Sequence, residues 1–179
     1  MVYDAQQYMA IYEELLACFG PQGWWPGDSP FEIMVGAVLT QAVAWKNVEK
    51  AIAELKRADV FSVTKIIDTP QDELAMLIKS ALYSRQKAKK LTILMQFIMD
   101  KYQGNLDLMF AEPLDGLRRE LLGLWGIGPE TADSILLYAG NYPVFVVDSY
   151  TIRIFSQTLR QTFYLAMSRS FKNWHRLFH

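Results

Sequence analysis

Asp148 is the residue of this sequence whose type and surroundings are best suited to chemistry. It follows the apolar run Val144 to Val147 and precedes the segment Ser149 to Arg153. An acid at such a junction is a helix N-cap, a partly buried functional carboxylate, or both, because a cap lies at the positive end of the helix dipole. A carboxylate held there can orient or deprotonate water and stabilise positive charge in a transition state.

A second candidate lies just upstream, in the turn from Leu122 to Glu130. Gly126 and Gly128 allow backbone angles that a side chain would penalise, and Pro129 suits the first turn of a new helix. A tight turn followed by a helix start leaves backbone N–H groups that bind a phosphate without a basic side chain. For this segment alone, an ordinary turn between two helices is an equally good interpretation.

The third group is aromatic. Trp24, Trp25 and Pro26 lie in a loop between two helical patterns, and Trp45 follows at the start of another helix. Adjacent tryptophans in a loop form either a hydrophobic plug or the wall of a pocket that stacks on a flipped nucleic-acid base. Trp45 is placed to face Trp24 across such a pocket, or to pack within its own helix.

The pattern L-x-G-I-G-x-x-T-A-D, followed at a short distance by V-V-D-S-x-x-x-R, resembles the paired signature of the endonuclease III superfamily of DNA glycosylases. The resemblance extends from Trp24 to Arg153 and implies that Asp148 is the catalytic aspartate. Bifunctional members carry a lysine nucleophile where this chain has Glu130, so no Schiff-base lyase step is expected. Glu130 and the Trp24–Pro26 loop most resemble the 3-methyladenine DNA glycosylase branch, which implies excision of an alkylated purine from double-stranded DNA.

The resemblance also implies contacts to DNA. They fall on Gln41 and on the hairpin residues Gly126, Ile127, Gly128, Glu130 and Thr131. In the family the glutamine that matches Gln41 enters the duplex beside the flipped nucleotide, although a solvated helix end is an alternative interpretation of Gln41. Arg85 and Lys87 lie in a basic segment similar to a family motif, although a solvated face explains such a segment equally well. Family hairpins bind a monovalent cation through backbone carbonyls, which here belong to Leu122, Leu124 and Ile127.

Helical periodicity places these residues on an all-α scaffold. It predicts helices over residues 4–19, 31–41, 45–58, 62–68 and 70–80, then a long helix to about residue 102 and another that starts at Pro113, with no strand pattern. The lysines of the long helix are expected to project outward, while Ala88, Leu91, Leu94, Met95 and Ile98 face inward. The resemblance implies a two-lobed helical fold around a helix-hairpin-helix element.

Three domains are predicted. Residues 1–29 form an N-terminal helix and aromatic loop of the second lobe. Residues 30–155 form the helical domain with hairpin 122–130 and Asp148, and residues 156–179 are an unmatched tail. Because that tail is short, we expect an incomplete second lobe, an apolar patch near the N-terminal helix, and weak or absent turnover. The tail is either a natural short variant or a truncated or frame-shifted gene end.

Composition limits the remaining possibilities. The 179 residues carry a formal net charge of −1, so a DNA-binding surface must be local. Cys18 is the only cysteine, which rules out a cysteine-ligated iron–sulfur cluster within the chain, and no other cofactor is expected. The absence of a signal or an apolar span predicts a cytoplasmic protein. We expect a monomer. A non-catalytic helix-hairpin-helix module and an inactive remnant are the alternatives to an enzyme.

Overall fold

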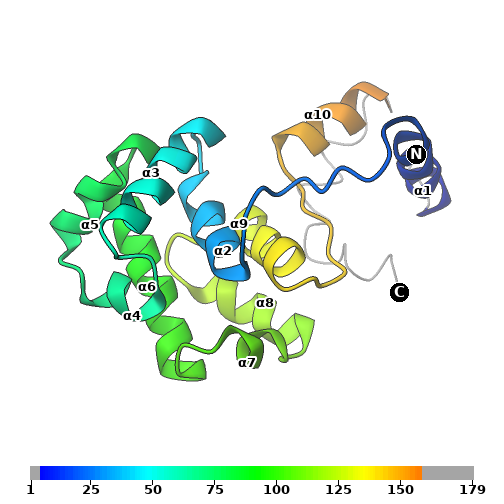
Figure 1. Ribbon diagram of the computed structural model, residues 1–179. Coiled ribbons are helices and arrows are strands. Elements are labelled where there is room, and N and C mark those ends of the chain that lie inside the picture. The colour runs from blue at the N-terminus through cyan, green and yellow to red at the C-terminus, as the bar shows by residue number, and fades with distance from the viewer. Residues whose placement is uncertain (1–4, 159–179) are drawn as a thin grey trace. The chain divides into compact units, whose positions relative to one another are not determined.

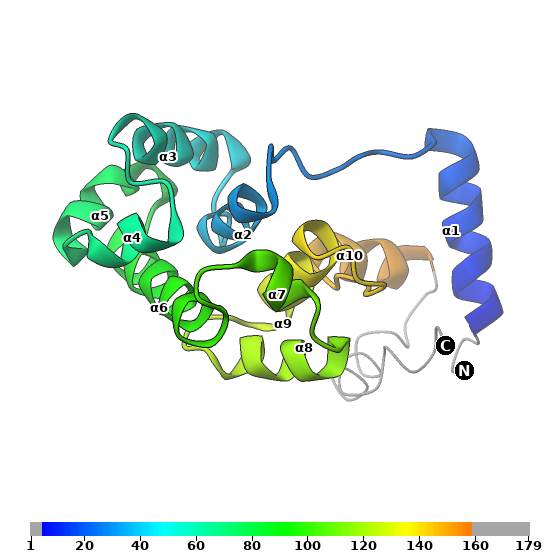
Figure 2. The same ribbon diagram turned by 60° about the horizontal axis from the view of Figure 1, so that its bottom comes forward.

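The computed structural model describes residues 5–158, and every regular element in that range is helical (Figures 1 and 2). The all-α prediction is confirmed. The chain divides into two compact units: residues 25–143, here called the hairpin unit, and residues 1–24 with 144–179, here called the terminal unit. These limits differ from the predicted ones at 29 and 155, since Trp25 begins the hairpin unit and Asp148 belongs to the terminal unit. Residues 159–179 of the predicted tail lie outside the described range.

The hairpin unit is built around α2, Pro30–Leu39. Its start follows the capping pattern of the sequence, because the Ser29 hydroxyl accepts a hydrogen bond from the Glu32 N–H (3.2 Å) and Pro30 occupies the first turn. All residues from 32 to 39 are buried. The helix contacts α3 (Trp45–Arg57), α6 (Ser84–Tyr102) and α9 (Pro129–Ser134), as expected for a helix that is apolar on all sides.

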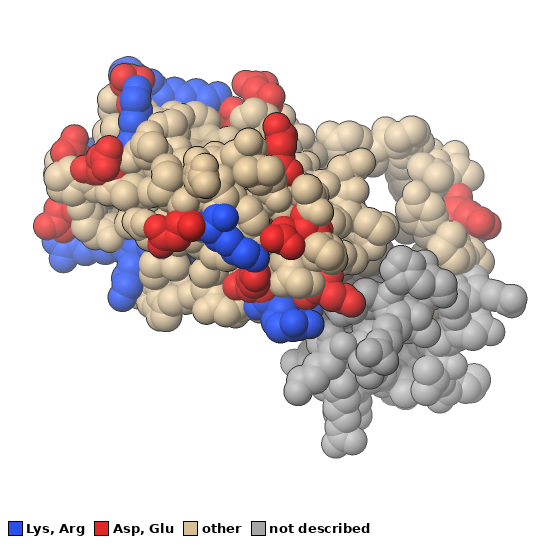
Figure 3. Space-filling model, turned by 90° about the horizontal axis from the view of Figure 1, so that it is seen from below, with Lys and Arg blue, Asp and Glu red and all other residues tan. Residues whose placement is uncertain are grey.

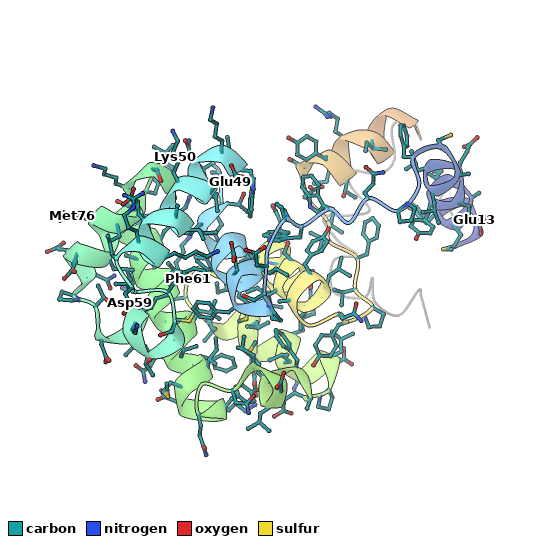
Figure 4. The ribbon with its side chains drawn as sticks, viewed as in Figure 1. Glu13, Glu49, Lys50, Asp59, Phe61 and Met76 are labelled. Atoms are coloured by element: carbon teal, nitrogen blue, oxygen red, sulfur yellow. The ribbon has the colours of Figure 1, made fainter. Side chains whose placement is uncertain are left out.

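The remaining helices of this unit pack mainly against α6 and α9. They are α4 (Val63–Asp68), α5 (Gln71–Leu77), α7 (Leu106–Phe110) and α8 (Leu114–Gly123). The predicted helix over 70–80 is divided, because α5 stops at Leu77 and a 3₁₀ turn, Lys79–Ala81, follows. Figure 4 shows Lys50 and Met76 directed away from the helices, whereas Phe61 points inward, where its ring meets Phe31 edge-on at a centroid distance of 5.0 Å.

Lys87 corrects one prediction for α6. Its side chain does not project outward but is 2% exposed, and its Nζ donates to the backbone carbonyls of Leu39 (2.8 Å) and Ala81 (2.5 Å). These carbonyls lie at the ends of α2 and the 3₁₀ turn, where a helix leaves acceptors unpaired. Burial, together with repulsion from Lys90, lowers the pKa of Lys87 to about 8. The long stem of this lysine therefore fills a core position, and its charge joins helix ends.

The terminal unit contains α1, Ala5–Phe19, and α10, Ser149–Thr158. Large apolar side chains on α1 remain exposed, among them Tyr12, Leu15, Leu16 and Phe19, the last at 69%. None of the helices in the described range is both long and apolar enough to cross a membrane.

Candidate functional site

The turn between α8 and α9 has the hairpin geometry expected from its sequence. Leu124 leaves the helical conformation, the Ile127 N–H donates to the Leu124 carbonyl (3.1 Å), and Gly126 takes a φ of +85° that favours glycine. Gly128 differs from the expectation, because its φ of −92° and ψ of 176° are open to any residue. A Cβ at Gly128 would meet nothing within 4 Å. Neither conformation nor packing against the described residues therefore requires glycine at this position.

Backbone donors are free at this turn. The N–H groups of Gly126 and Gly128 donate to no other residue in the described part of the chain. Pro129 has no N–H and begins α9, as the sequence predicted. Two unbonded N–H groups beside an unobstructed Gly128 can receive an anion that approaches closely. Glu130 lies exposed in the first turn of α9.

Two lysines of α6 hold the hairpin from one side. The stem of Lys90 lies against Gly126, since a Cβ on that glycine would come within 2.6 Å of Lys90 Cγ and Cε. The neighbouring Lys89 places its ammonium 4.6 Å from the ring centroid of Trp125, a half-exposed side chain within the turn. This cation–π contact is exposed and is worth about 0.5–1 kcal/mol, so it supports the turn only weakly. The sequence showed both lysines only as part of a charged segment.

Gln41 is bound to the hairpin through both ends of its amide. Its Nε2 donates to the Gly126 carbonyl (3.1 Å) and to the Thr131 hydroxyl (2.9 Å), and its Oε1 accepts from Lys90 Nζ (2.5 Å). Thr131 itself is buried. The predicted site residues Gln41, Gly126 and Thr131 are thus brought together, with Lys90 as an unpredicted fourth member.

A buried ion pair joins the two helices of the hairpin. Arg118 Nε on α8 donates to Asp133 Oδ1 (2.6 Å), and Nη2 donates to Oδ2 (3.0 Å). The side chains are 13% and 9% exposed. This bidentate contact fixes the angle at which the helices leave the turn. Asp133 belongs to the T-A-D part of the sequence pattern, but its partner lies on a different helix, so periodicity gave no indication of the pair.

The aromatic residues form a cluster in the hairpin unit. Trp25 meets Trp45 edge-on at 5.6 Å between ring centroids, and its other neighbour is Tyr138 at 5.1 Å with the planes tilted by 35°. Gly36 on α2 provides the floor, because a Cβ there would lie 3.2 Å from Trp45 Cη2 and 3.4 Å from Trp25 Cζ2. The ring that faces Trp45 is therefore Trp25. Trp24, predicted for that place, belongs to the terminal unit and is 69% exposed, and Pro26 is also exposed.

Two features of this cluster were not predictable from composition. Tyr138 reaches Trp25 from a π-helical turn, Ile135–Ala139, that continues α9, and such turns often occur at functional sites. In the described residues the indole N–H groups of Trp25 and Trp45 are buried without an acceptor. Each buried, unpaired donor costs about 1–3 kcal/mol. A ligand that offers acceptors would relieve this cost.

Asp148 is the N-cap of α10 in the terminal unit. Its Oδ1 accepts a hydrogen bond from the Thr151 N–H (2.7 Å), and its carbonyl accepts the first helical bond, from Ile152. Among the described residues Oδ2 has no hydrogen-bond partner, and the side chain is partly buried. The cap interpretation is thus confirmed. One carboxylate oxygen positions the helix, while the other is free for a second role.

On the one face of the hairpin unit that Figure 3 draws, the basic residues form no continuous surface. Over the hairpin unit, Figure 3 shows acidic and basic side chains interleaved on the face that it draws. Arg85 is exposed, and its Nε lies 3.8 Å from Asp72 Oδ1. Lys87, predicted to contact DNA, is buried and bound to two carbonyls, so its ammonium has no surface from which to reach a phosphate.

The hairpin carbonyls fit the chemistry of the implied monovalent cation. The Leu124 oxygen accepts the Ile127 N–H, whereas those of Leu122 and Ile127 accept no backbone hydrogen bond from another described residue. Hard cations prefer such oxygen ligands. No cluster of three or more His, Cys, Asp or Glu side chains suited to a metal occurs within residues 5–158.

Comparisons with known proteins identify relatives. The sequence model described as HhH-GPD superfamily base excision DNA repair protein matches residues 35–162. A proposed DNA repair glycosylase of Methanocaldococcus jannaschii is 47% identical over 149 residues, which cover 82% of this chain and 67% of that protein. Endonuclease III of Thermotoga maritima is 32% identical over 132 residues, 70% of this chain, and the chain spans 54% of its length.

A solved structure shares the fold. The crystal structure of 3-methyladenine DNA glycosylase of H. pylori, bound to 1,N6-ethenoadenine, superposes with a TM-score of 0.74. The sequences are 31% identical, and the match covers 89% of this chain and 75% of that one.

Proposed function

Because the chain belongs to the HhH-GPD superfamily of base excision DNA repair proteins, we propose that it is a monofunctional DNA glycosylase that releases an alkylated purine, such as 3-methyladenine, from double-stranded DNA. The observation that carries the choice of base is the Trp25–Trp45–Tyr138 cluster. N-alkylation makes a purine cationic, and aromatic rings attract a flat cation by stacking and by cation–π interaction. The similarity to the 3-methyladenine glycosylase of H. pylori supports the same choice.

The proposed mechanism needs little assistance to the leaving group. An alkylated purine is already a good leaving group, and cleavage of the N-glycosidic bond places positive charge on the sugar. The free Oδ2 of Asp148 would stabilise that charge and orient the attacking water. Hydrolysis by water leaves an abasic site and an intact strand, so the reaction ends without a lyase step.

Two features support the monofunctional proposal and the mode of binding. Glu130 occupies the position at which bifunctional relatives are expected to carry lysine, and a carboxylate cannot form a Schiff base. The free N–H groups of Gly126 and Gly128 suit a DNA phosphate, which positions the protein without reading sequence. We also propose that the carbonyls of Leu122, Leu124 and Ile127 hold a monovalent cation, which would stiffen the turn.

Asp148→Asn tests the proposal. Asparagine retains the cap through its side-chain oxygen but removes the charge. We expect at least about a hundredfold slower base release from methylated duplex DNA, with nearly unchanged DNA affinity, because only transition-state electrostatics are lost. Wild-type protein should give strand breaks only after alkali, and borohydride should trap no covalent adduct.

Matched variants define the opposing results. Asp148→Ala removes the cap as well as the charge, so its additional loss of stability, about 1 kcal/mol, measures the structural role alone. Equal losses of binding and turnover in Asp148→Asn would show that Asp148 is only a cap. Efficient borohydride trapping by wild-type protein would refute the monofunctional mechanism. Binding without base release by wild-type protein would identify a non-catalytic module.

A further inference from the structure

Within residues 5–158, Lys90 is a half-buried cation without an anionic partner. Its Nζ contacts the neutral Oε1 of Gln41 at 2.5 Å, and it makes no ion pair with any acid in the described part of the chain. Its stem lies against Gly126, beside a turn whose two free N–H groups are also uncompensated donors. An ammonium bound only to a neutral oxygen gains from a phosphate the attraction of a full opposite charge, which the amide oxygen of Gln41 does not supply.

We propose that Lys90 is a phosphate-binding residue that in the free protein is held by Gln41, and that it exchanges the Gln41 oxygen for a DNA phosphate when the hairpin binds the backbone. This inference rests on the proposed function only in that the ligand is duplex DNA. It assigns to Lys90 the contact that the sequence had assigned to the buried Lys87.

The exchange has a structural consequence for Gln41. Its amide is fixed to the hairpin by three hydrogen bonds, one of which comes from Lys90. Loss of that bond leaves Oε1 unpaired, while Nε2 keeps Gly126 and Thr131. Phosphate binding and the freedom of the Gln41 side chain are therefore linked through one ammonium group, and Lys90 acts on Gln41 as a positioning residue.

Three variants separate these roles. Lys90→Met keeps the stem that covers Gly126 and removes the ammonium, whereas Lys90→Gln keeps a donor for Gln41 but removes the charge. Lys89→Met is the matched control, because it removes an adjacent positive charge that contacts Trp125 and not Gln41. Thermal unfolding of each variant checks that it is folded before binding is compared.

The affinity for undamaged duplex DNA is measured by fluorescence anisotropy at several salt concentrations. One lost phosphate contact makes the plot of log affinity against log salt less steep by about 0.9. We expect this change in Lys90→Met and Lys90→Gln and no change in Lys89→Met. Unchanged slopes in the Lys90 variants, or an equal change in Lys89→Met, would overturn the proposal.

NMR of the Gln41 side-chain amide gives the second readout. We expect its signals to shift in free Lys90→Met and, in wild-type protein, to move the same way on addition of DNA; in Lys90→Gln they should stay near the wild-type position. Gln41 signals that do not shift in Lys90→Met would refute the link between the Lys90 ammonium and the Gln41 side chain. Both measurements use undamaged DNA, so they test the role of Lys90 whether or not the protein releases a base. Failure of base release would refute only the proposed function.

Discussion

The burial of Lys87 predicts an unusual dependence of stability on pH. The pKa of this lysine falls from 10.5 to about 8, chiefly because burial penalises the charged form and secondarily because Lys90 repels it. Below pH 8 the group is protonated in both the folded and the unfolded chain. Between about pH 8 and 10.5 the unfolded chain keeps its proton while the folded chain loses it, so the free energy of unfolding rises with pH.

The magnitude follows from the width of that window. One proton contributes about 1.4 kcal/mol per pH unit, so full titration of Lys87 is worth about 3 kcal/mol. The perturbation is Lys87→Met, which keeps a long side chain and cannot titrate. The stability of wild type minus that of Lys87→Met should therefore rise by about 2 kcal/mol between pH 7 and 9.5. Burial raises the pKa of Tyr102 and of Tyr142, but both tyrosines are present in both proteins and cancel in the difference.

Urea denaturation followed by circular dichroism at several pH values measures this difference. Lys46→Met, which removes an exposed lysine, separates the effect of burial from the loss of one positive charge. NMR titration of the Lys87 side chain reports its pKa directly. A difference that stays flat from pH 7 to 9.5 would refute the reasoning, because it would mean that the carbonyls of Leu39 and Ala81 solvate the ammonium as well as water does.

Two further predictions concern the hairpin. Asp133→Ala leaves Arg118 buried without its partner and should lower the free energy of unfolding, measured with urea, by about 3–5 kcal/mol. Replacement of both residues by leucine should recover most of that loss. If it does not, the ion pair itself supplies the stability. Gly126→Ala forces a side chain into positive φ and against Lys90, and we expect it to lower the free energy of unfolding by about 1–2 kcal/mol. Gly128→Ala should leave the melting temperature unchanged and weaken DNA binding. Equal destabilisation by the two variants would contradict the geometry of the turn.

Local signals in the sequence were sufficient for much of the fold. Ser29 with Pro30 marked the start of α2, and Pro129 marked the start of α9. A helix cap was one of the two roles predicted for Asp148. Each of these is decided by a few neighbouring residues, through side-chain to backbone hydrogen bonds or a fixed proline φ. The all-round apolar character of residues 31–39 likewise identified the buried helix.

Contacts between distant segments could not be predicted in the same way. Trp45 faces Trp25 and not Trp24, and Tyr138 on a π-helical turn packs against the same Trp25 ring. The partner of Asp133 is likewise on a different helix, at Arg118. Such pairs depend on how helices pack, which periodicity within one helix does not contain.

The lysines of α6 show how far a charge pattern can mislead. Lys87, Lys89 and Lys90 look alike in the sequence, yet one is buried against two helix-end carbonyls, one lies over an aromatic ring, and one is held by an amide oxygen. Helix position explains part of this, since residue 87 lies one turn before Leu91 on the inward-facing stripe. With a net charge of −1, the chain has no general attraction for DNA. A turn with free N–H groups and one uncompensated ammonium can still bind a phosphate. The local attraction of two donors and one positive charge for the phosphate does not depend on the total charge of the molecule.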